Sequence, residues 1–274
     1  PGLRAVSERA PRPTDHREMD LDSAAAVTDR GVRHDRNEDD FALAARGKRK
    51  MAVVCDGVSS TANPDLASTA AAGAIAEALE PLLRRRSPKP EVVAAALRDA
   101  IAGSSQAVAA LPQSESGGPD SPPSTTVVAA WCAPGRVVVA HVGDNRAYWV
   151  ADSGEASRLT RDHSWAEAAI EAGVPEADAY AAPGAHVITG WVGADGADAD
   201  ARVAELEVTE PGTLLLCTDG LWNYFEAPAA LAELVARAGG PAAPALKVAR
   251  DLIAAALDAG GGDNVTAAVV RVGT

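Results

Sequence analysis

Three features are scarce in this 274-residue sequence, and each scarcity narrows the possibilities. Aromatic residues make up only 4% of the chain, so a core must be built mainly from Ala, Val and Leu. The three cysteines, Cys55, Cys132 and Cys217, lie in separate apolar runs without a Cys-x-x-Cys pair, which argues against a zinc site and predicts buried thiols in a reducing compartment. No apolar run approaches the ~20 residues that span a bilayer, and the first residues lack the apolar core of a signal peptide. A cytoplasmic location without membrane association is the resulting prediction.

Basic residues are also in the minority. The chain has 25 Lys and Arg against 38 Asp and Glu, a net charge of −13. Nucleic acid and anionic membrane surfaces would repel such a chain, so neither is expected as the main partner. Cationic partners or bound metal ions fit the charge better.

An apolar run that ends in Asp-Gly occurs twice. Residues 51–57 read Met-Ala-Val-Val-Cys-Asp-Gly, and residues 214–220 read Leu-Leu-Leu-Cys-Thr-Asp-Gly. Each run has the length of a buried strand, so each Asp lies where a core strand stops. A single Asp-Gly is usually only a turn. Two copies behind matched strands instead predict that Asp56 and Asp219 can reach one hard cation, with glycine allowing the backbone to approach it closely.

The pattern of apolar residues predicts clustered strands and paired helices. Residues 1–20 lack an apolar period and are predicted to be a flexible tail, followed by a single domain over 21–274. Strands are expected at 23–28, 41–45, 51–57, 125–133, 136–142, 146–150, 203–208, 213–217 and 265–272, and helices at 65–86, 90–111, 159–172, 227–238 and 242–259. We expect 125–150 to form an antiparallel meander, 203–217 a hairpin, 113–124 a surface loop, and the irregular stretch to residue 200 a flap. Such an order favours an α+β fold with mainly antiparallel sheets.

Eight short motifs follow one another along the chain: Arg30-Gly31, Asn37-Glu38-Asp39, Asp56-Gly57, Thr125-Thr126, Gly143-Asp144-Asn145-Arg146, Leu159-Thr160-Arg161-Asp162-His163-Ser164, Cys217-Thr218-Asp219-Gly220 and Asp263-Asn264-Val265-Thr266. Their order resembles that of the metal-dependent protein phosphatases. From about residue 24 to 272 the chain is similar to the protein phosphatase 2C-like (PPM) family, in particular its bacterial serine/threonine phosphatase branch. The resemblance implies a four-layer α-β-β-α sandwich, two antiparallel sheets face to face with a helix pair on each outside. It also implies one domain, because motifs from both ends of the chain must meet in one site.

The residues themselves support metal chemistry. Phosphate monoesters hydrolyse very slowly in water, so a catalyst must supply a strong nucleophile and neutralise phosphoryl charge. Asp39, Asp56, Asp219 and Asp263 would repel one another by several kcal/mol per close pair if brought together without cations. All-oxygen ligands select Mg²⁺ or Mn²⁺ over zinc.

The resemblance assigns individual roles. It implies that Asp56 bridges two ions, that the Gly57 carbonyl completes one shell, that Asp219 and Asp263 hold the other ion, and that Asp144 takes a possible third. Glu38 and Asp39 would orient metal-bound waters, and a water bridging the two ions would attack phosphorus in line without a phospho-enzyme. The cysteines are then not catalytic.

Two further motifs carry weaker assignments. His163 either handles protons or, more commonly for a His beside Asp162 at a helix start, is a cap or a packed side chain. Thr125 and Thr126 are expected to be structural.

The departures from the family pattern concern phosphate binding. The family's phosphate-holding Arg falls on His34, flanked by Arg33 and Arg36, so any of the three could hold the phosphate. Val58-Ser59-Ser60 follows the first Asp-Gly without a His, which leaves the general acid unassigned, and Asn145 replaces a usual Ser.

The resulting prediction is a metal-dependent phosphatase that acts on phosphoserine and phosphothreonine proteins and opposes a serine/threonine kinase. The alternative is a degenerate relative that binds phosphoprotein or metal and regulates without turnover. The intact metal set favours the enzyme.

Overall fold

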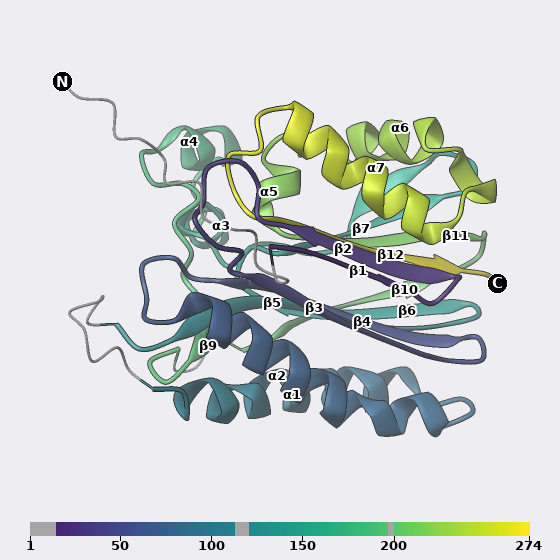
Figure 1. Ribbon diagram of the computed structural model, residues 1–274, viewed down its shortest axis with the longest axis horizontal. Helices are drawn as coiled ribbons and strands as arrows, with labels where there is room; N and C mark the ends of the chain where they lie inside the picture. Colours follow the sequence, from purple (N-terminus) through teal and green to yellow (C-terminus); the bar gives the residue numbers. More distant parts are fainter. Residues whose placement is uncertain (1–14, 113–120, 197–199) are drawn as a thin grey trace.

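The computed structural model describes residues 15–112, 121–196 and 200–274, and its strands form two sheets that lie face to face (Figure 1). The first sheet has the order β1-β2-β12-β11-β7-β8 and the second the order β10-β6-β5-β4-β3, with the short β9 paired to β5. Every strand pair is antiparallel. The first sheet consists of β1 His16–Asp20, β2 Ala24–Asp29, β12 Val265–Val272, β11 Gly212–Cys217, β7 Arg146–Ala151 and β8 Ala156–Arg158, and the second of β10 Arg202–Glu207, β6 Arg136–Val142, β5 Ser124–Ala133, β4 Arg49–Gly57, β3 Asp39–Arg46 and β9 Val192–Gly193.

Helices cover the outer face of each sheet, which confirms the predicted four-layer α+β sandwich. Helices α1 (Pro64–Arg84) and α2 (Pro90–Ala109) lie on the second sheet, whereas α6 (Pro228–Arg237) and α7 (Ala245–Asp258) lie on the first (Figure 1). Three short helices, α3 (Trp165–Glu171), α4 (Glu176–Ala181) and α5 (Asp219–Trp222), and the 3-10 turn Gly240–Ala242 complete the described elements.

The layers follow from strands that are apolar on both faces. In β4, Val53 and Cys55 pack under α1 and α2, while the alternate residues Ala52 and Val54 point into the core between the sheets. Successive strand side chains point to opposite faces, so a strand between two layers must be apolar throughout. Ala and Val fill these positions, as the scarcity of aromatic residues requires.

Two predicted strand pairings are wrong, because the chain changes sheets where a hairpin was expected. β5 and β6 pair as predicted, but β7 pairs with β11 and β8 in the opposite sheet, so 125–150 is not one meander. Likewise β10 pairs with β6 while β11 pairs with β7 and β12, so 203–217 is not a hairpin. The first crossing is made at Gly143, whose φ of +99° suits glycine and whose missing side chain leaves room for Thr126.

Smaller corrections concern the chain ends and helix lengths. The predicted tail is wrong for residues 16–20, because they form β1 on the edge of the first sheet; residues 1–14 lie outside the described residues. Residues 113–120 of the predicted loop also lie outside them. The helix expected over 159–172 begins only at Trp165, and the irregular stretch after it contains α4.

One helix departs from the expectation that no segment could span a membrane. Among the described residues, α1 is long and apolar enough to cross a bilayer by length and composition, because its many alanines raise its mean hydropathy. In this fold it packs against the second sheet and α2, and Ile75, Leu79 and Leu82 are buried there.

Candidate metal centre

Five aspartates lie where strands of both sheets end or begin. Asp39 begins β3, Asp56 is the penultimate residue of β4, and Asp219 lies two residues after β11, at the start of α5. Asp263 precedes β12, and Asp144 lies on the crossing from β6 to β7. Asp39 and Asp56 are direct cross-strand partners, an unfavourable position for two like charges.

The aspartates lie close enough together for the charge of one to raise the pKa of another. Burial raises the pKa of Asp56 well above its ordinary value, and the negative charges of Asp39, Asp219, Asp144 and Asp263 raise it further. The fold therefore brings the predicted carboxylates into one neighbourhood, and without a cation it keeps several of them from ionising freely.

Asp39 is held by one oxygen only. Its Oδ2 accepts hydrogen bonds from the hydroxyls of Thr218, at 2.9 Å, and Thr266, at 2.8 Å. Its Oδ1 is buried and has no hydrogen-bond partner among the described residues. Burial raises the pKa of Asp39 well above its ordinary value, more than the two hydroxyls lower it. A buried carboxylate oxygen without a partner is costly, and a cation would satisfy it.

Asp219 and Asp144 have raised pKa values for similar reasons. Burial, followed by the charge of Asp263, raises the pKa of Asp219 to about 6, although Asn223 donates to its Oδ2 at 3.2 Å. Burial, followed by the charges of Asp219 and Asp162, raises the pKa of Asp144 to about 7. Both groups would ionise more readily beside a metal ion.

The oxygen donors fit Mg²⁺ or Mn²⁺, but they do not surround an ion with protein ligands alone. All the converging donors are oxygens, which hard divalent cations prefer. In the part of the chain that the structure describes, no three His, Cys, Asp or Glu side chains lie close enough together to form a ready-made ion site. Mg²⁺ usually keeps several waters and takes only one or two carboxylates directly, so an open arrangement suits it.

The two glycines after the strand-end aspartates serve chain packing. A Cβ on Gly57 would lie 2.2 Å from the carbonyl oxygen of Pro64, and a Cβ on Gly220 would lie 2.0 Å from that of Asn264. Each glycine thus lets another backbone segment pass against the site. Close approach to a cation was the predicted reason, and that role for the Gly57 carbonyl stays a prediction.

Glu38 is fixed beside the aspartates by three neighbours. Its carboxylate accepts from Arg36 Nε at 2.9 Å and from the Ser59 hydroxyl at 2.5 Å, while its backbone N–H donates to Asn264 at 2.7 Å. Ser59, one of the departures from the family pattern, therefore supports the predicted Glu38.

The three candidates for holding phosphate have different surroundings. His34 Nε2 lies 3.0 Å from a carboxylate oxygen of Asp263, so it faces a predicted metal ligand. Arg36 is paired with Glu38 at 2.9 Å and with Asp65 at 3.2 Å. Arg33 is exposed and forms no salt bridge with any described residue. Arg33 is thus the guanidinium that is free to turn towards a phosphate.

A buried ion pair supports the Asp144 crossing. Arg146 binds both carboxylate oxygens of Asp162, the shortest contact being 2.7 Å, and its guanidinium lies 3.6 Å from the centre of the Trp222 ring. Trp222 in turn donates its indole N–H to the Asp144 carbonyl at 3.0 Å. This chain of contacts links α5, which begins at Asp219, to the backbone of Asp144.

His163 and the cysteines occupy structural positions. His163 Nδ1 accepts from the Gly143 N–H at 3.3 Å, its ring packs edge-on to His141, and burial lowers its pKa. These contacts favour the interpretation of His163 as a packed side chain. All three cysteines are buried and unpaired, as predicted, and burial raises the pKa of each thiol.

Sequence reasoning gave no role to Thr218, Thr266 or Asn264, although each stood in a quoted motif. The two threonines hold Asp39, and Asn264 also donates to the carbonyls of Arg30 and Arg36, so it ties down the loop between β2 and β3. The available signal was the position of Thr218 and Asn264 next to Asp219 and Asp263, and of Thr266 in the otherwise apolar start of β12.

The chain is similar to several known phosphatases. The profile of the family described as Protein phosphatase 2C matches residues 30–253. A serine/threonine phosphatase stp of Listeria welshimeri is 29% identical over 72% of this chain and 76% of its own length. PstP of Mycobacterium tuberculosis, a serine/threonine protein phosphatase, is 29% identical over 90% of this chain, which spans 44% of that protein.

Solved structures show the same fold. The serine/threonine phosphatase of S. agalactiae superposes with a TM-score of 0.74 at 23% identity, covering 91% of this chain and 98% of that one. The catalytic domain of PstP, solved in complex with 2 manganese ions, gives a TM-score of 0.67 at 26% identity over 91% of this chain and 97% of that one.

Proposed function

The chain belongs to the protein phosphatase 2C family, and from this premise we propose that it is a metal-dependent phosphatase of phosphoserine and phosphothreonine in proteins. The observation that carries the proposal is the gathering of Asp39, Asp56, Asp219, Asp263 and Asp144 at one edge of the sandwich, with Asp39 Oδ1 buried and unpartnered among the described residues.

These aspartates would hold two Mn²⁺ or Mg²⁺ ions, with Asp144 available to a third. Asp56 lies among the other four carboxylates and would help to hold both ions, with the Gly57 carbonyl beside it, while Asp219 and Asp263 would hold the second ion. Bound there, the ions would neutralise phosphoryl charge and lower the pKa of water for in-line attack on phosphorus.

The protein's own contribution is to hold these groups still. Thr218 and Thr266 fix one oxygen of Asp39, so its other oxygen stays directed into the buried site. Arg36 and Ser59 hold Glu38 so that it can accept a hydrogen bond from water at the site. Preorganised groups of this kind lower the barrier because they need not reorganise during the reaction.

The substrate phosphate would be held by Arg33. Arg36 is engaged by Glu38 and Asp65, and His34 faces Asp263, whereas Arg33 has no such partner among the described residues. A guanidinium can bind a phosphate through two parallel hydrogen bonds. His34 would then orient Asp263.

Phosphorylated proteins are the proposed substrates, which the names of the relatives support, and a serine/threonine kinase is the proposed opponent. Three buried free thiols support a reducing, cytoplasmic location.

Hydrolysis of a phosphothreonine peptide and of an aryl phosphate tests the proposal. We expect phosphate release with millimolar Mn²⁺ or Mg²⁺ and none after the ions are removed. Release of phosphate that survives exhaustive chelation contradicts the proposed mechanism, and metal binding without any turnover identifies a regulatory relative instead.

A further inference from the structure

A cluster of basic side chains lies at the end of the sandwich opposite the aspartates. Three connections meet there, the β3–β4 turn, the link from α1 to α2 and the β5–β6 turn, and they surround a hollow of about 760 Å³. Figure 1 shows the first two at the right-hand end of the second sheet. We name this hollow the basic pocket. Its cationic lining residues are Lys48, Arg49, Arg86, Lys89 and Arg136.

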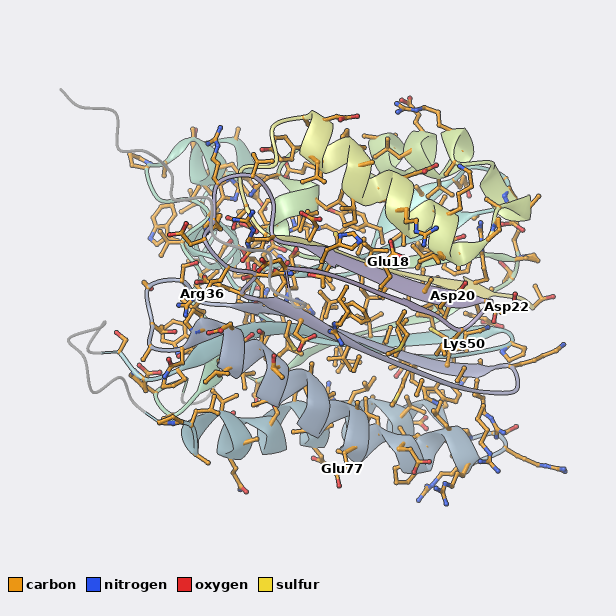
Figure 2. All side chains as sticks on the ribbon, viewed as in Figure 1. Glu18, Asp20, Asp22, Arg36, Lys50 and Glu77 are labelled. Atoms are coloured by element: carbon orange, nitrogen blue, oxygen red, sulfur yellow. The ribbon has the colours of Figure 1, made fainter. Side chains whose placement is uncertain are left out.

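The basic pocket is distant from the metal centre. Strand β4 begins at Arg49 and reaches Asp56 seven residues later, which at ~3.3 Å per residue is roughly 23 Å. Figure 2 accordingly shows Arg36 near one end of the sandwich and Lys50, the neighbour of Arg49, towards the other. A ligand in the basic pocket would therefore not touch the catalytic groups.

The cations of the basic pocket are not neutralised. None of the five forms a salt bridge with a carboxylate in the described ranges 15–112, 121–196 and 200–274. Among the residues that the structure describes, none that lines the hollow is acidic. The acidic residue nearest to the α1–α2 link is Glu91, in the first turn of α2, and among the described residues it forms no salt bridge; Glu80 of α1 binds Arg84. Five uncompensated cations around one hollow are unfavourable on their own, and their concentration in a chain of net charge −13 contrasts with the rest of its surface.

The other half of the lining is apolar and rigid. Pro88, Pro90 and Pro134 form part of the rim, and Trp131 and Ala133 of β5 form part of the wall. Proline fixes the backbone of the rim, so little chain entropy is lost when a ligand binds.

We propose that the basic pocket binds a small organic anion that carries two or more phosphate groups, such as a nucleoside diphosphate. The volume is within the range of small-molecule sites, ~300–1,000 Å³. The cations would bind the phosphates and the apolar rim would cover the organic body. A phosphate chain, unlike a single carboxylate, can contact several of the five cations at once.

Isothermal titration of the full chain with ADP tests this proposal. The titration is run at low salt without divalent ions, because ADP would otherwise bind through metal at the catalytic end. We expect 1:1 binding that weakens as salt is raised. Arg86→Glu with Lys89→Glu should weaken binding at least tenfold, and pyrophosphate should bind at least threefold more weakly than ADP.

The matched control is Lys247→Glu with Arg250→Glu on α7. Both pairs change the net charge by the same amount, but Lys247 and Arg250 are exposed and engaged by Asp251 and Glu18. The control should bind ADP within twofold of the original chain, and Asp219→Asn should bind it equally well. Both double variants should hydrolyse aryl phosphate as the original chain does.

Several outcomes would overturn the proposal. An equal loss in both double variants would show a general charge effect, and a loss in Asp219→Asn would place ADP at the catalytic end. Equal affinity for pyrophosphate and ADP would show that the organic part of the ligand adds nothing to binding, which contradicts a site for an organic anion. No ADP binding up to millimolar concentration, together with Arg86- and Lys89-dependent binding to phosphatidylglycerol vesicles, would identify a membrane contact instead.

Discussion

Replacing Asp144 with Asn should stabilise the protein when metal is absent. Burial and the charges of Asp219 and Asp162 raise the pKa of Asp144 from 3.8 to about 7. Between these two values the folded chain keeps a proton that the unfolded chain has released. The free energy of unfolding therefore falls as pH rises through this window, and the full loss is reached above pH 7.

The size of the effect follows from the shift. One pKa unit corresponds to about 1.4 kcal/mol, so three units give about 4 kcal/mol as an upper bound. The side chain is partly exposed, and water screens the repulsion, so we take about half, roughly 2 kcal/mol. Asn cannot ionise, so the variant lacks the destabilisation that comes from ionising Asp144 in the folded chain. The hydrogen bond from Trp222 to the backbone carbonyl of residue 144 is kept.

Urea denaturation of the metal-free chain at pH 5, 6.5 and 8 measures how much the ionisation of Asp144 lowers the free energy of unfolding. Asp144→Asn should be more stable than the original chain by about 2 kcal/mol at pH 8 and by less than 1 kcal/mol at pH 5. Buried His141 acts in the opposite direction, because its pKa is lowered to about 4 and its contribution is lost as pH falls below about 6.5. Both proteins contain His141, so the difference between them isolates Asp144.

The control is Asp251→Asn, an exposed carboxylate bound to Lys247, which should show no such dependence on pH. Saturating Mn²⁺ should reverse the order, because the ion stabilises the ionised Asp144 that the variant lacks. A metal-free Asp144→Asn variant that is no more stable than the original chain at pH 8 refutes the reasoning.

Three further perturbations probe the rest of the site. Mn²⁺ at a hundredfold excess over its dissociation constant should stabilise the fold by about 2.7 kcal/mol and raise the melting temperature; Asp56→Ala should abolish the rise, and an unchanged rise would place the ions elsewhere. Arg33→Ala should raise the Michaelis constant for a phosphopeptide about tenfold, a loss of about 1.4 kcal/mol, and a larger effect of His34→Ala would assign the phosphate to His34. Arg146→Met should cost about 3–5 kcal/mol in urea denaturation, because buried Asp162 then keeps only the longer ion pair with Arg158, at 3.9 Å; a loss below 1 kcal/mol would contradict the importance of the Arg146–Asp162 pair.

The sequence was informative wherever the signal was periodic. Buried strands such as 51–57 and helices such as α1 were predicted within a few residues, because apolar spacing reports directly on which face is buried. The two strand-end aspartates were predicted for the same reason, since each ends a run that can only be a core strand.

The sequence was uninformative about which sheet a strand joins. A short polar link after β6 has the same composition whether the chain turns back or crosses to the other sheet, and only the packing of both sheets against a common core decides. The hydroxyls of Thr218 and Thr266 were missed for a related reason. Threonine is an ordinary strand residue, and its bond to Asp39 joins segments about 180 residues apart or more.

The central claim is that the strand-end aspartates form a cation-dependent catalytic centre, and a titration of turnover with Mn²⁺ tests it most directly. Hydrolysis of a phosphothreonine peptide is followed from zero to millimolar Mn²⁺ for the original chain, for Asp219→Asn and for the control Asp251→Asn. Turnover should rise from none to saturation in the original chain and the control, and should remain at least a hundredfold lower in Asp219→Asn. Turnover without Mn²⁺ or any other divalent ion, or an Asp219→Asn variant as active as the control, would contradict the claim.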